Sequence, residues 1–212
     1  MKLQLYNPEF FQGNLKMKNY FEGWYFKHVS RELNHVWSFI PGISLNSKDA
    51  HAFIQVINGN TSATNYISYP LSDFIWDKNS FFIKIGDSVF SENYIDLNLI
   101  SENIRIKGRL DYFNIVKYPK SLFSPGIMGW YSFVPFMECK HGICSVLHDL
   151  SGELEINDVL VNFREGKGYI EKDWGTSFPE AWLWIQANNF ITRESPAIRR
   201  EIEQELRQEF DK

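Results

Sequence analysis

Cysteine is scarce in this sequence, with two residues, Cys139 and Cys144, among 212. Two cysteines are too few for a disulfide scaffold, and their spacing matches no zinc-binding pattern. We expect two free, buried thiols in a reducing compartment. The first residues lack the apolar core of a signal peptide, and no run approaches the roughly 18 apolar residues of a transmembrane helix. These absences predict a soluble, cytoplasmic protein.

The net charge is also small: the formal value is -4, and lysine and arginine form no cluster in the sequence. Such a balance gives no electrostatic footprint for nucleic acid, so no nucleic-acid partner is expected. The sequence contains no serine-nucleophile motif, no P-loop and no dinucleotide-binding motif. Its five histidines show no clustered ligand spacing, so we expect neither a metal nor a cofactor.

Aromatic residues, in contrast, are abundant at 17% of the chain: 18 Phe, 10 Tyr and 7 Trp. Aromatic side chains favour β-strands and also line pockets for apolar ligands. A bulky β core that binds nothing is the simpler interpretation of the composition. The composition therefore predicts an aromatic-rich β protein and leaves ligand binding open.

Most of the chain is predicted to form short strands between turns. A period of two is clearest at residues 94–100 and 104–110, where apolar and polar side chains alternate as in a sheet with one wet face. Pro41–Gly42 is expected to end a strand, and residues 118–131, rich in proline and glycine, to form a long connection or lid. The regular spacing predicts an all-β, lipocalin-like antiparallel barrel or sandwich. The other expected strands are 21–29, 35–40, 51–57, 81–85, 143–150, 152–156, 159–163, 168–171 and 182–187.

The chain is expected to divide into a β region, residues 1–192, and a charged C-terminal helix, residues 193–212. Ser195 suits the N-cap and Pro196 the first helical position. A narrow apolar stripe on this helix would dock along a sheet edge or barrel mouth, or would pair with another chain. The stripe consists of Ile198, Ile202, Leu206 and Phe210.

Three segments mix polar and aromatic residues more densely than a plain core requires. On the first strand, Glu22 shares a face with Trp24 and Phe26. A carboxylate that faces inward among aromatics would have a raised pKa and could act as an acid. Alternatively, Glu22 faces water at the start of the strand.

In the second segment, Glu171 and Asp173 have the i, i+2 spacing that places both on one side of an extended strand, with Lys172 on the other. Paired carboxylates can split their pKa values, so that one stays protonated as a general acid. The alternative is that Asp173 only caps backbone amides in the following turn.

The third segment carries two indoles and two amides on one face, and these could stack an aromatic head group and bind its hydroxyls. They are Trp182, Trp184, Gln186 and Asn188. His148, next to Asp149, is a further candidate acid or base, although a lone strand histidine is more often structural.

The same segments resemble the tocopherol cyclase family. Residues 20–27 (YFEGWYFK), 125–135 (PGIMGWYSFVP) and 168–190 (GYIEKDWGTSFPEAWLWIQANNF) are similar to its motifs, in the same order, and the resemblance extends over about residues 7–190. It implies a lipocalin-like fold, distantly related to carotenoid hydratases. It also implies cofactor-free closure of a chromanol ring, in which an acid protonates the side-chain alkene of a prenylated hydroquinone and the phenol oxygen captures the cation.

On this basis Asp173 or Glu171 is the expected proton donor, and Glu22 is the alternative. A binding pocket in the barrel is expected to be formed by Trp24, Trp174, Trp182, Trp184, Gln186, Asn188 and His148. A second hypothesis is a non-catalytic carrier of a hydrophobic ligand on the same fold. Peripheral contact with a membrane, and self-association through the C-terminal helix, are further expectations.

The chain departs from the family in its C-terminal end and in its composition. Family chains usually continue with further strands beyond the third motif, so we expect a truncated member with one full and one incomplete barrel half. The Lys-, Asn- and Ile-rich composition suggests an AT-rich bacterial gene. The substrate could therefore be a prenylated or polycyclic lipid other than a tocopherol precursor.

Overall fold

Twelve β-strands make up nearly all of the regular structure. The computed structural model describes residues 2–178, 180, 181, 183–186 and 204. The named helical elements are short turns, α1 (Lys2–Leu5), η1 (Leu71–Asp73) and η2 (Gly129–Phe133). The strands are β1 (Phe21–Val29), β2 (Val36–Leu45), β3 (Ala50–Asn58), β4 (Ala63–Pro70), β5 (Phe74–Trp76), β6 (Phe82–Ile85), β7 (Ser88–Ser91), β8 (Tyr94–Ile100), β9 (Arg105–Val116), β10 (Cys139–Ile156), β11 (Val159–Asn162) and β12 (Lys167–Gly175).

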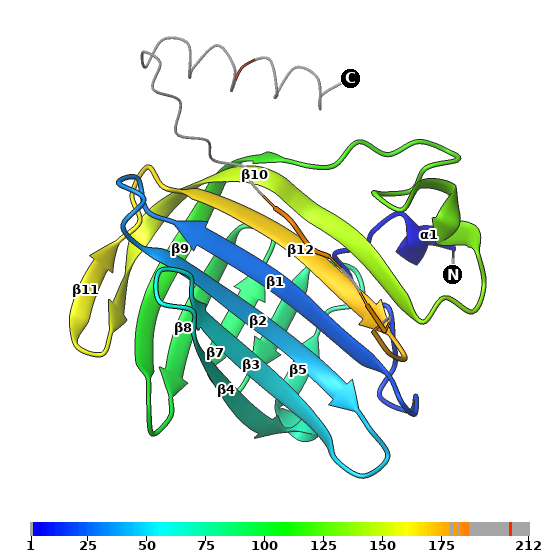
Figure 1. Cartoon of the computed structure of the whole chain (residues 1–212), viewed down its shortest axis with the longest axis horizontal. Helices are drawn as coiled ribbons and strands as arrows, with labels where there is room; N and C mark the ends of the chain where they lie inside the picture. The colour runs from blue at the N-terminus through cyan, green and yellow to red at the C-terminus, as the bar shows by residue number, and fades with distance from the viewer. Residues whose placement is uncertain (1, 179, 182, 187–203, 205–212) are drawn as a thin grey trace.

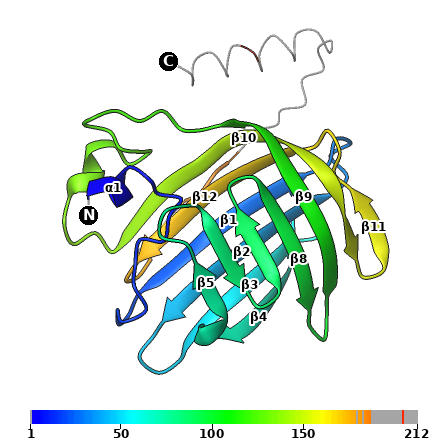
Figure 2. The same cartoon turned by 180° about the vertical axis from the view of Figure 1, so that it is seen from behind.

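All of these strands belong to one antiparallel sheet, in the order β4-β3-β2-β1-β12-β10-β9-β8-β7-β6-β5, with β11 paired to β10 alone. The sheet curls so that its two end strands, β4 and β5, lie near each other and are joined through η1 (Figure 1, Figure 2). The predicted all-β antiparallel barrel is therefore confirmed, in a nearly closed form. No strand of a second, incomplete half occurs among the described residues.

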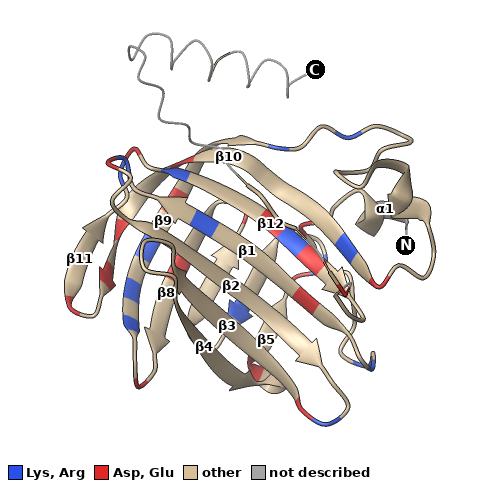
Figure 3. Cartoon of the chain, viewed as in Figure 1, with Lys and Arg blue, Asp and Glu red and all other residues tan. Residues whose placement is uncertain are grey.

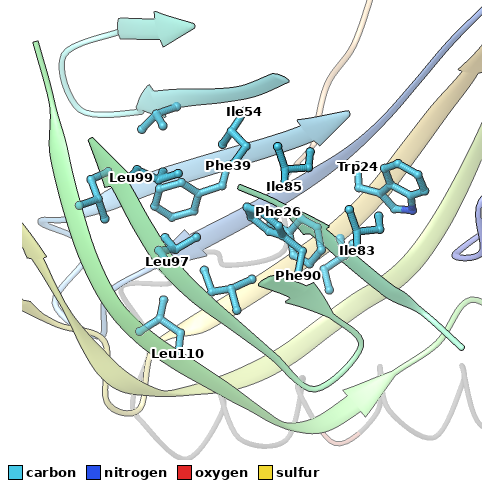
Figure 4. Packing of buried hydrophobic residues seen from close by; sticks show 14 of the residues in the cluster. Trp24, Phe26, Phe39, Ile54, Ile83, Ile85, Phe90, Leu97, Leu99 and Leu110 are labelled. Carbon is cyan, nitrogen blue, oxygen red and sulfur yellow. The ribbon is translucent and has the colours of Figure 1, made fainter. Parts of the chain in front are cut away.

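The inward side chains fill the barrel with a single hydrophobic cluster (Figure 4). On β1, residues alternate between buried and half-buried, and Trp24 and Phe26 face the interior with no exposed surface. Phe39 from β2 and Phe90 from β7 pack into the same cluster, and Phe26 and Phe90 lie 5.4 Å apart between ring centroids. The period of two predicted for 94–100 and 104–110 also holds, because Ile95, Leu97 and Leu99 are buried and the charged residues of both ranges are exposed.

The expectation that Pro41–Gly42 ends a strand was wrong. β2 continues to Leu45, and Pro41 stays in register with Ile54 of β3. Opposite β1, however, the pairing stops between Gly42 and Phe39, so the missing N–H of Pro41 falls where the ladder is already interrupted. Gly42 suits this position because a Cβ there would come within 2.6 Å of the Glu22 carbonyl oxygen.

Other boundaries differ for local reasons. The strands expected at 143–150 and 152–156 are one strand, β10, which bends at Gly152, where φ is 128°. β4 was not predicted, since none of its residues is buried and the hydrophobic alternation is weak. The long connection at 118–131 is confirmed, and η2 lies at its end. The strand expected at 182–187 is not formed by 183–186, and the C-terminal helix lies outside the described residues.

Candidate functional site

The register of β1, β12 and β10 brings a polar cluster together on the outer face of the barrel. Asp173 on β12 lies opposite His141 on β10, and Glu171 lies opposite Tyr25 on β1. Cross-strand partners in an antiparallel sheet point to the same face. These four residues, with Tyr169, are called the outer-face cluster. The predicted placement of Glu171 and Asp173 on one side, with Lys172 on the other, agrees with this register.

His141 lies between the two carboxylates. Its Nδ1 is 2.8 Å from Asp173 Oδ1, and its Nε2 is 3.7 Å from Glu171 Oε2. Tyr169 donates a hydrogen bond of 2.7 Å to Glu171. The side chains of His141 and Asp173 are 30% and 34% exposed, whereas that of Glu171 is 6% exposed. The cluster therefore has a buried carboxyl group at one end and a solvent-accessible pair at the other.

This environment favours the protonated forms of two groups. Burial raises the pKa of Glu171, although the Tyr169 hydrogen bond and the nearby His141 oppose the rise. Burial acts against protonation of His141, but the hydrogen bond and charge of Asp173 outweigh it, so the pKa of His141 is raised. Proximity of a raised-pKa carboxyl group to an imidazole is suited to general acid–base chemistry.

The chain after β12 returns over this face and contributes aromatic and amide groups (Figure 1). Trp184 packs edge-on against Tyr25 at 5.4 Å between ring centroids, and its side chain hydrogen-bonds Glu171. Gln186 accepts a 2.7 Å hydrogen bond from Lys27. Trp184 is still 41% exposed, so the cover is partial. Trp182 and Asn188 lie outside the described residues.

Glu22 lies on the opposite face, inside the barrel, which is one of the two alternatives that the sequence left open. It forms an ion pair of 2.6 Å with Lys172, and neither side chain has exposed surface. Its carboxylate also accepts hydrogen bonds from Tyr20 and from the backbone N–H groups of Gln12 and Gly13. Both oxygens are thus engaged as acceptors, an arrangement that anchors the N-terminal segment better than it delivers a proton to a substrate.

The remaining predicted residues are also inside the barrel or at its end. Trp24 and Trp174 lie on either side of Lys172, each ring centroid 4.7 Å from its Nζ. His148 is buried, bonds Ser145 at 2.8 Å and lies against Gly168, away from the carboxylate pair. The interior pocket that was expected to contain the carboxylates is occupied by packed side chains around Trp24, and Glu171 and Asp173 face outward instead.

A groove of about 1070 Å³ opens at the end of β12, between the N-terminal segment and the 118–138 connection. Trp174, Tyr20 and Lys140 belong to its wall, together with apolar side chains of both segments. Trp174 and Asp173 are successive residues on β12, so the groove and the outer-face cluster lie on opposite sides of the same strand end.

Sequence reasoning missed His141, Tyr169 and Tyr25. Tyr25 and Tyr169 lie within two of the motifs, but the contacts of all three residues are set by strand register rather than by sequence distance. Among the described residues, no group of three His, Cys, Asp or Glu side chains could hold a metal ion. Both cysteines are free, and burial raises the pKa of Cys139 to about 12. The described residues include no helix with the length and hydropathy of a membrane span.

Comparison with known proteins points to one family. A sequence profile described as tocopherol cyclase-like matches residues 111–200, which contain the outer-face histidine and both carboxylates. The chloroplastic tocopherol cyclase of Zea mays is 37% identical over 62 residues, and the probable tocopherol cyclase of Oryza sativa subsp. japonica is 36% identical over 62. Each match covers 29% of this chain and 13% of the relative, so only a small part of either relative is represented.

Two crystal structures of CghA, one of them with Sch210972, also align with the chain. The identities are 12% and 11%, and the TM-scores are 0.47 and 0.45. The alignments cover 75% and 74% of this chain and 46% of each of the other chains. The profile match spans two of the three motifs on which the resemblance was based, 125–135 and 168–190, and residues 111–200 are similar to the tocopherol cyclase-like family.

Proposed function

We propose that the protein is a cofactor-free cyclase that closes a ring on a prenylated hydroquinone or a related isoprenoid by acid catalysis. The observation that carries the proposal is the row Asp173–His141–Glu171 on the outer face of the barrel. The tocopherol cyclase-like match includes all three residues, which supports the assignment to this class of chemistry.

Glu171 is the proposed proton donor. Its pKa is raised by burial, so a larger fraction of the carboxyl group retains its proton near neutral pH. The proton adds to the side-chain alkene and produces a tertiary carbocation. The phenolic oxygen attacks that carbon to form the ring C–O bond, and the phenolic proton returns to Glu171. The reaction is an isomerisation, so it consumes neither an oxidant nor a reductant.

His141 provides the return path for the proton. Asp173 accepts a hydrogen bond from Nδ1 and thereby leaves Nε2 directed towards Glu171 at 3.7 Å. This is the orientation in which an imidazole can exchange a proton with a neighbouring carboxylate once they approach more closely. Asp173 accordingly acts as a positioning residue in this scheme.

Aromatic groups around the cluster would stabilise the cation. Tyr25 and Trp184 lie beside Glu171, and Phe21 stacks on Phe178 at 4.7 Å on the same outer face. Aromatic faces attract a positive charge through their quadrupole, and the attraction grows where water is excluded. Lys27 and Gln186 offer a donor and an acceptor for the two hydroquinone hydroxyls.

The test uses a hydroquinone that carries a geranylgeranyl chain ortho to one hydroxyl, with the chromanol product measured by mass spectrometry. Glu171→Gln should lower turnover by about 100-fold or more, because general acid–base groups contribute that much. Asp173→Asn should also lower turnover, because His141 loses the carboxylate that directs its Nε2 towards Glu171. Circular dichroism should show both variants folded. Asp96→Asn, which changes an exposed carboxylate on β8, is the matched control and should retain wild-type turnover.

A carrier of a hydrophobic ligand is the second candidate, and the 1070 Å³ groove favours it. Carriers need only such a groove and no acid beside the ligand. Native mass spectrometry would then show the quinol bound and chemically unchanged after prolonged incubation. Bound quinol without any chromanol would contradict the cyclase proposal and favour the carrier.

A further inference from the structure

We infer that the 118–138 connection and the adjoining N-terminal segment form a docking surface for an anionic lipid bilayer. This inference concerns a different surface from the outer-face cluster and does not depend on the proposed chemistry. The surface is called the apolar rim. It consists of the groove-lining residues Leu5, Tyr6, Met17, Leu122, Phe123, Phe133 and Met137, with the neighbouring Trp130, Tyr131 and Phe136.

Large apolar side chains are unusually exposed along the apolar rim. Leu122 and Phe123 are 74% and 77% exposed, and Phe136 is 100% exposed. Scattered single apolar residues are normal on protein surfaces, but a contiguous exposed set marks an interaction site. Phe136 also has a φ of 63°, a backbone conformation that is unfavourable for an aromatic residue. The isolated chain gains no burial from this arrangement.

The residue types are those of a membrane interface. Trp130 and Tyr131 stack at 4.1 Å and are both at least half exposed, and aromatic residues with a polar tip concentrate at the level of lipid headgroups. Phe123 and Phe136 would enter the acyl region, as apolar residues of interfacial anchors do. The groove behind them would open towards the bilayer.

The charges around the apolar rim fit an anionic headgroup layer. Residues 117–137 contain two lysines and no acidic residue, although the chain as a whole has a net charge of -4. Lys16 and Lys18 are exposed on either side of Met17, and Lys140 contributes to the groove wall. Glu138, at the end of the connection, is the exposed acidic exception, and Figure 3 shows the connection beside α1 mostly free of red.

Lys117 and Lys120 contribute less, because both are paired with Glu9 at 3.7 and 3.6 Å. The attraction would come mainly from Lys16, Lys18 and Lys140, since each basic residue near an anionic membrane surface adds to binding. A second copy of the chain docked through the same face would bring two sets of lysines into one interface, and the repulsion between like charges would disfavour it. The charge pattern therefore favours a bilayer over self-association.

The test is co-sedimentation of the full chain with vesicles of phosphatidylglycerol, compared with vesicles of phosphatidylcholine alone. Binding to the anionic vesicles is expected, and the double variant Phe123→Ser/Phe136→Ser should lower the partition coefficient by about tenfold or more. Leu160→Ser, which removes an apolar side chain that is 65% exposed on β11, is the matched control and should bind like the wild type. Lys16→Glu/Lys18→Glu should lower binding to the anionic vesicles and leave the residual binding less sensitive to salt.

A second measurement reports contact with lipid in the wild-type protein itself. Brominated phosphatidylglycerol should quench part of the tryptophan emission of the wild-type protein, and Trp130→Phe should remove that part. Equal binding of the wild type and of Phe123→Ser/Phe136→Ser to the phosphatidylglycerol vesicles would overturn the inference. Absence of vesicle binding would also overturn it, whether or not sedimentation shows a dimer.

Discussion

At the scale of single residues, His141 couples the two carboxylates of the outer-face cluster. Its Nδ1 contacts Asp173 and its Nε2 faces Glu171, so each change in its charge is felt by both. The raised pKa of His141 depends on Asp173, because burial alone would lower it. Glu171 has a raised pKa for the opposite reason, since burial there penalises the carboxylate.

Asp173→Asn should therefore lower the pKa of His141. The substitution keeps the side-chain shape but removes the negative charge that favours the imidazolium. An NMR titration of the His141 ring protons measures the shift directly, with His51, whose neighbours are unchanged, as an internal reference. A His141 pKa that is the same in both proteins would show that Asp173 does not control this histidine.

At the scale of elements, β12 carries different groups on its two faces. Glu171 and Asp173 point outward to the candidate site, whereas Lys172 points inward to Glu22. Lys172 also donates a 2.6 Å hydrogen bond to the Phe10 carbonyl oxygen. Lys172 thereby connects β12, the strand that carries Glu171, to the N-terminal segment through this hydrogen bond and to β1 through the buried ion pair with Glu22.

Lys172→Met should destabilise the fold by about 3–5 kcal/mol, because it leaves the Glu22 carboxylate buried without its cation. The double variant Glu22→Gln/Lys172→Met should recover much of this loss, since no unpaired charge remains. Urea denaturation of the wild type and of both variants measures the free energies of unfolding. A double variant with a lower free energy of unfolding than Lys172→Met would show that Glu22 and Lys172 do not stabilise the fold as a pair.

Much of the barrel could be predicted from the sequence because strand alternation is local. The bounds of β1 and β8, the shared face of Glu22 and Trp24, and the shared face of Glu171 and Asp173 all follow from a period of two. The face of the barrel on which the candidate site lies could not be predicted. Whether a face lines the interior or the exterior of a barrel depends on how the whole sheet curls. The pairing of His141 with Asp173 depends on the register between β10 and β12, because the two residues are 32 positions apart in the sequence.

Edge and bulged strands escaped prediction for a related reason. β4 has no buried residue to create a hydrophobic pattern, and β10 is bent at Gly152 while remaining one strand. The Pro41–Gly42 pair has the residue types of a turn, yet the chain continues through it because β3 still pairs on the other side. In each case a neighbouring strand overrides the local signal.

At the scale of the whole molecule, the barrel encloses two neutral histidines. His28 bonds Tyr112 at 2.7 Å, and the Tyr112 and His148 rings lie 4.3 Å apart between centroids. Burial lowers the pKa of His28 from 6.5 to about 3, and burial and the neighbouring His28 lower the pKa of His148 as well. The Nε2 of His148 is buried without a hydrogen-bond partner, so a proton added there would be poorly accommodated.

The fold should therefore lose stability in mild acid. Below about pH 6.5 the unfolded chain protonates both histidines while the folded barrel does not, so stability falls as the pH decreases towards about 3. Each histidine contributes a slope of up to about 1.4 kcal/mol per pH unit. Urea midpoints measured across this range should decline less steeply in His28→Gln, which keeps an acceptor for Tyr112. Equal slopes would show that His28 is not the group responsible.

The most direct test of acid catalysis at the outer-face cluster is turnover of the geranylgeranyl hydroquinone in D₂O. If Glu171 protonates the alkene, the wild-type protein should form chromanol with one deuterium fixed on carbon, because the donated proton exchanges with solvent before each turnover. Glu171→Gln should form almost none, and Asp96→Asn should form the wild-type amount. Chromanol from Glu171→Gln at the wild-type rate, or no chromanol from the wild-type protein, would contradict the assignment of this cluster as the site of catalysis.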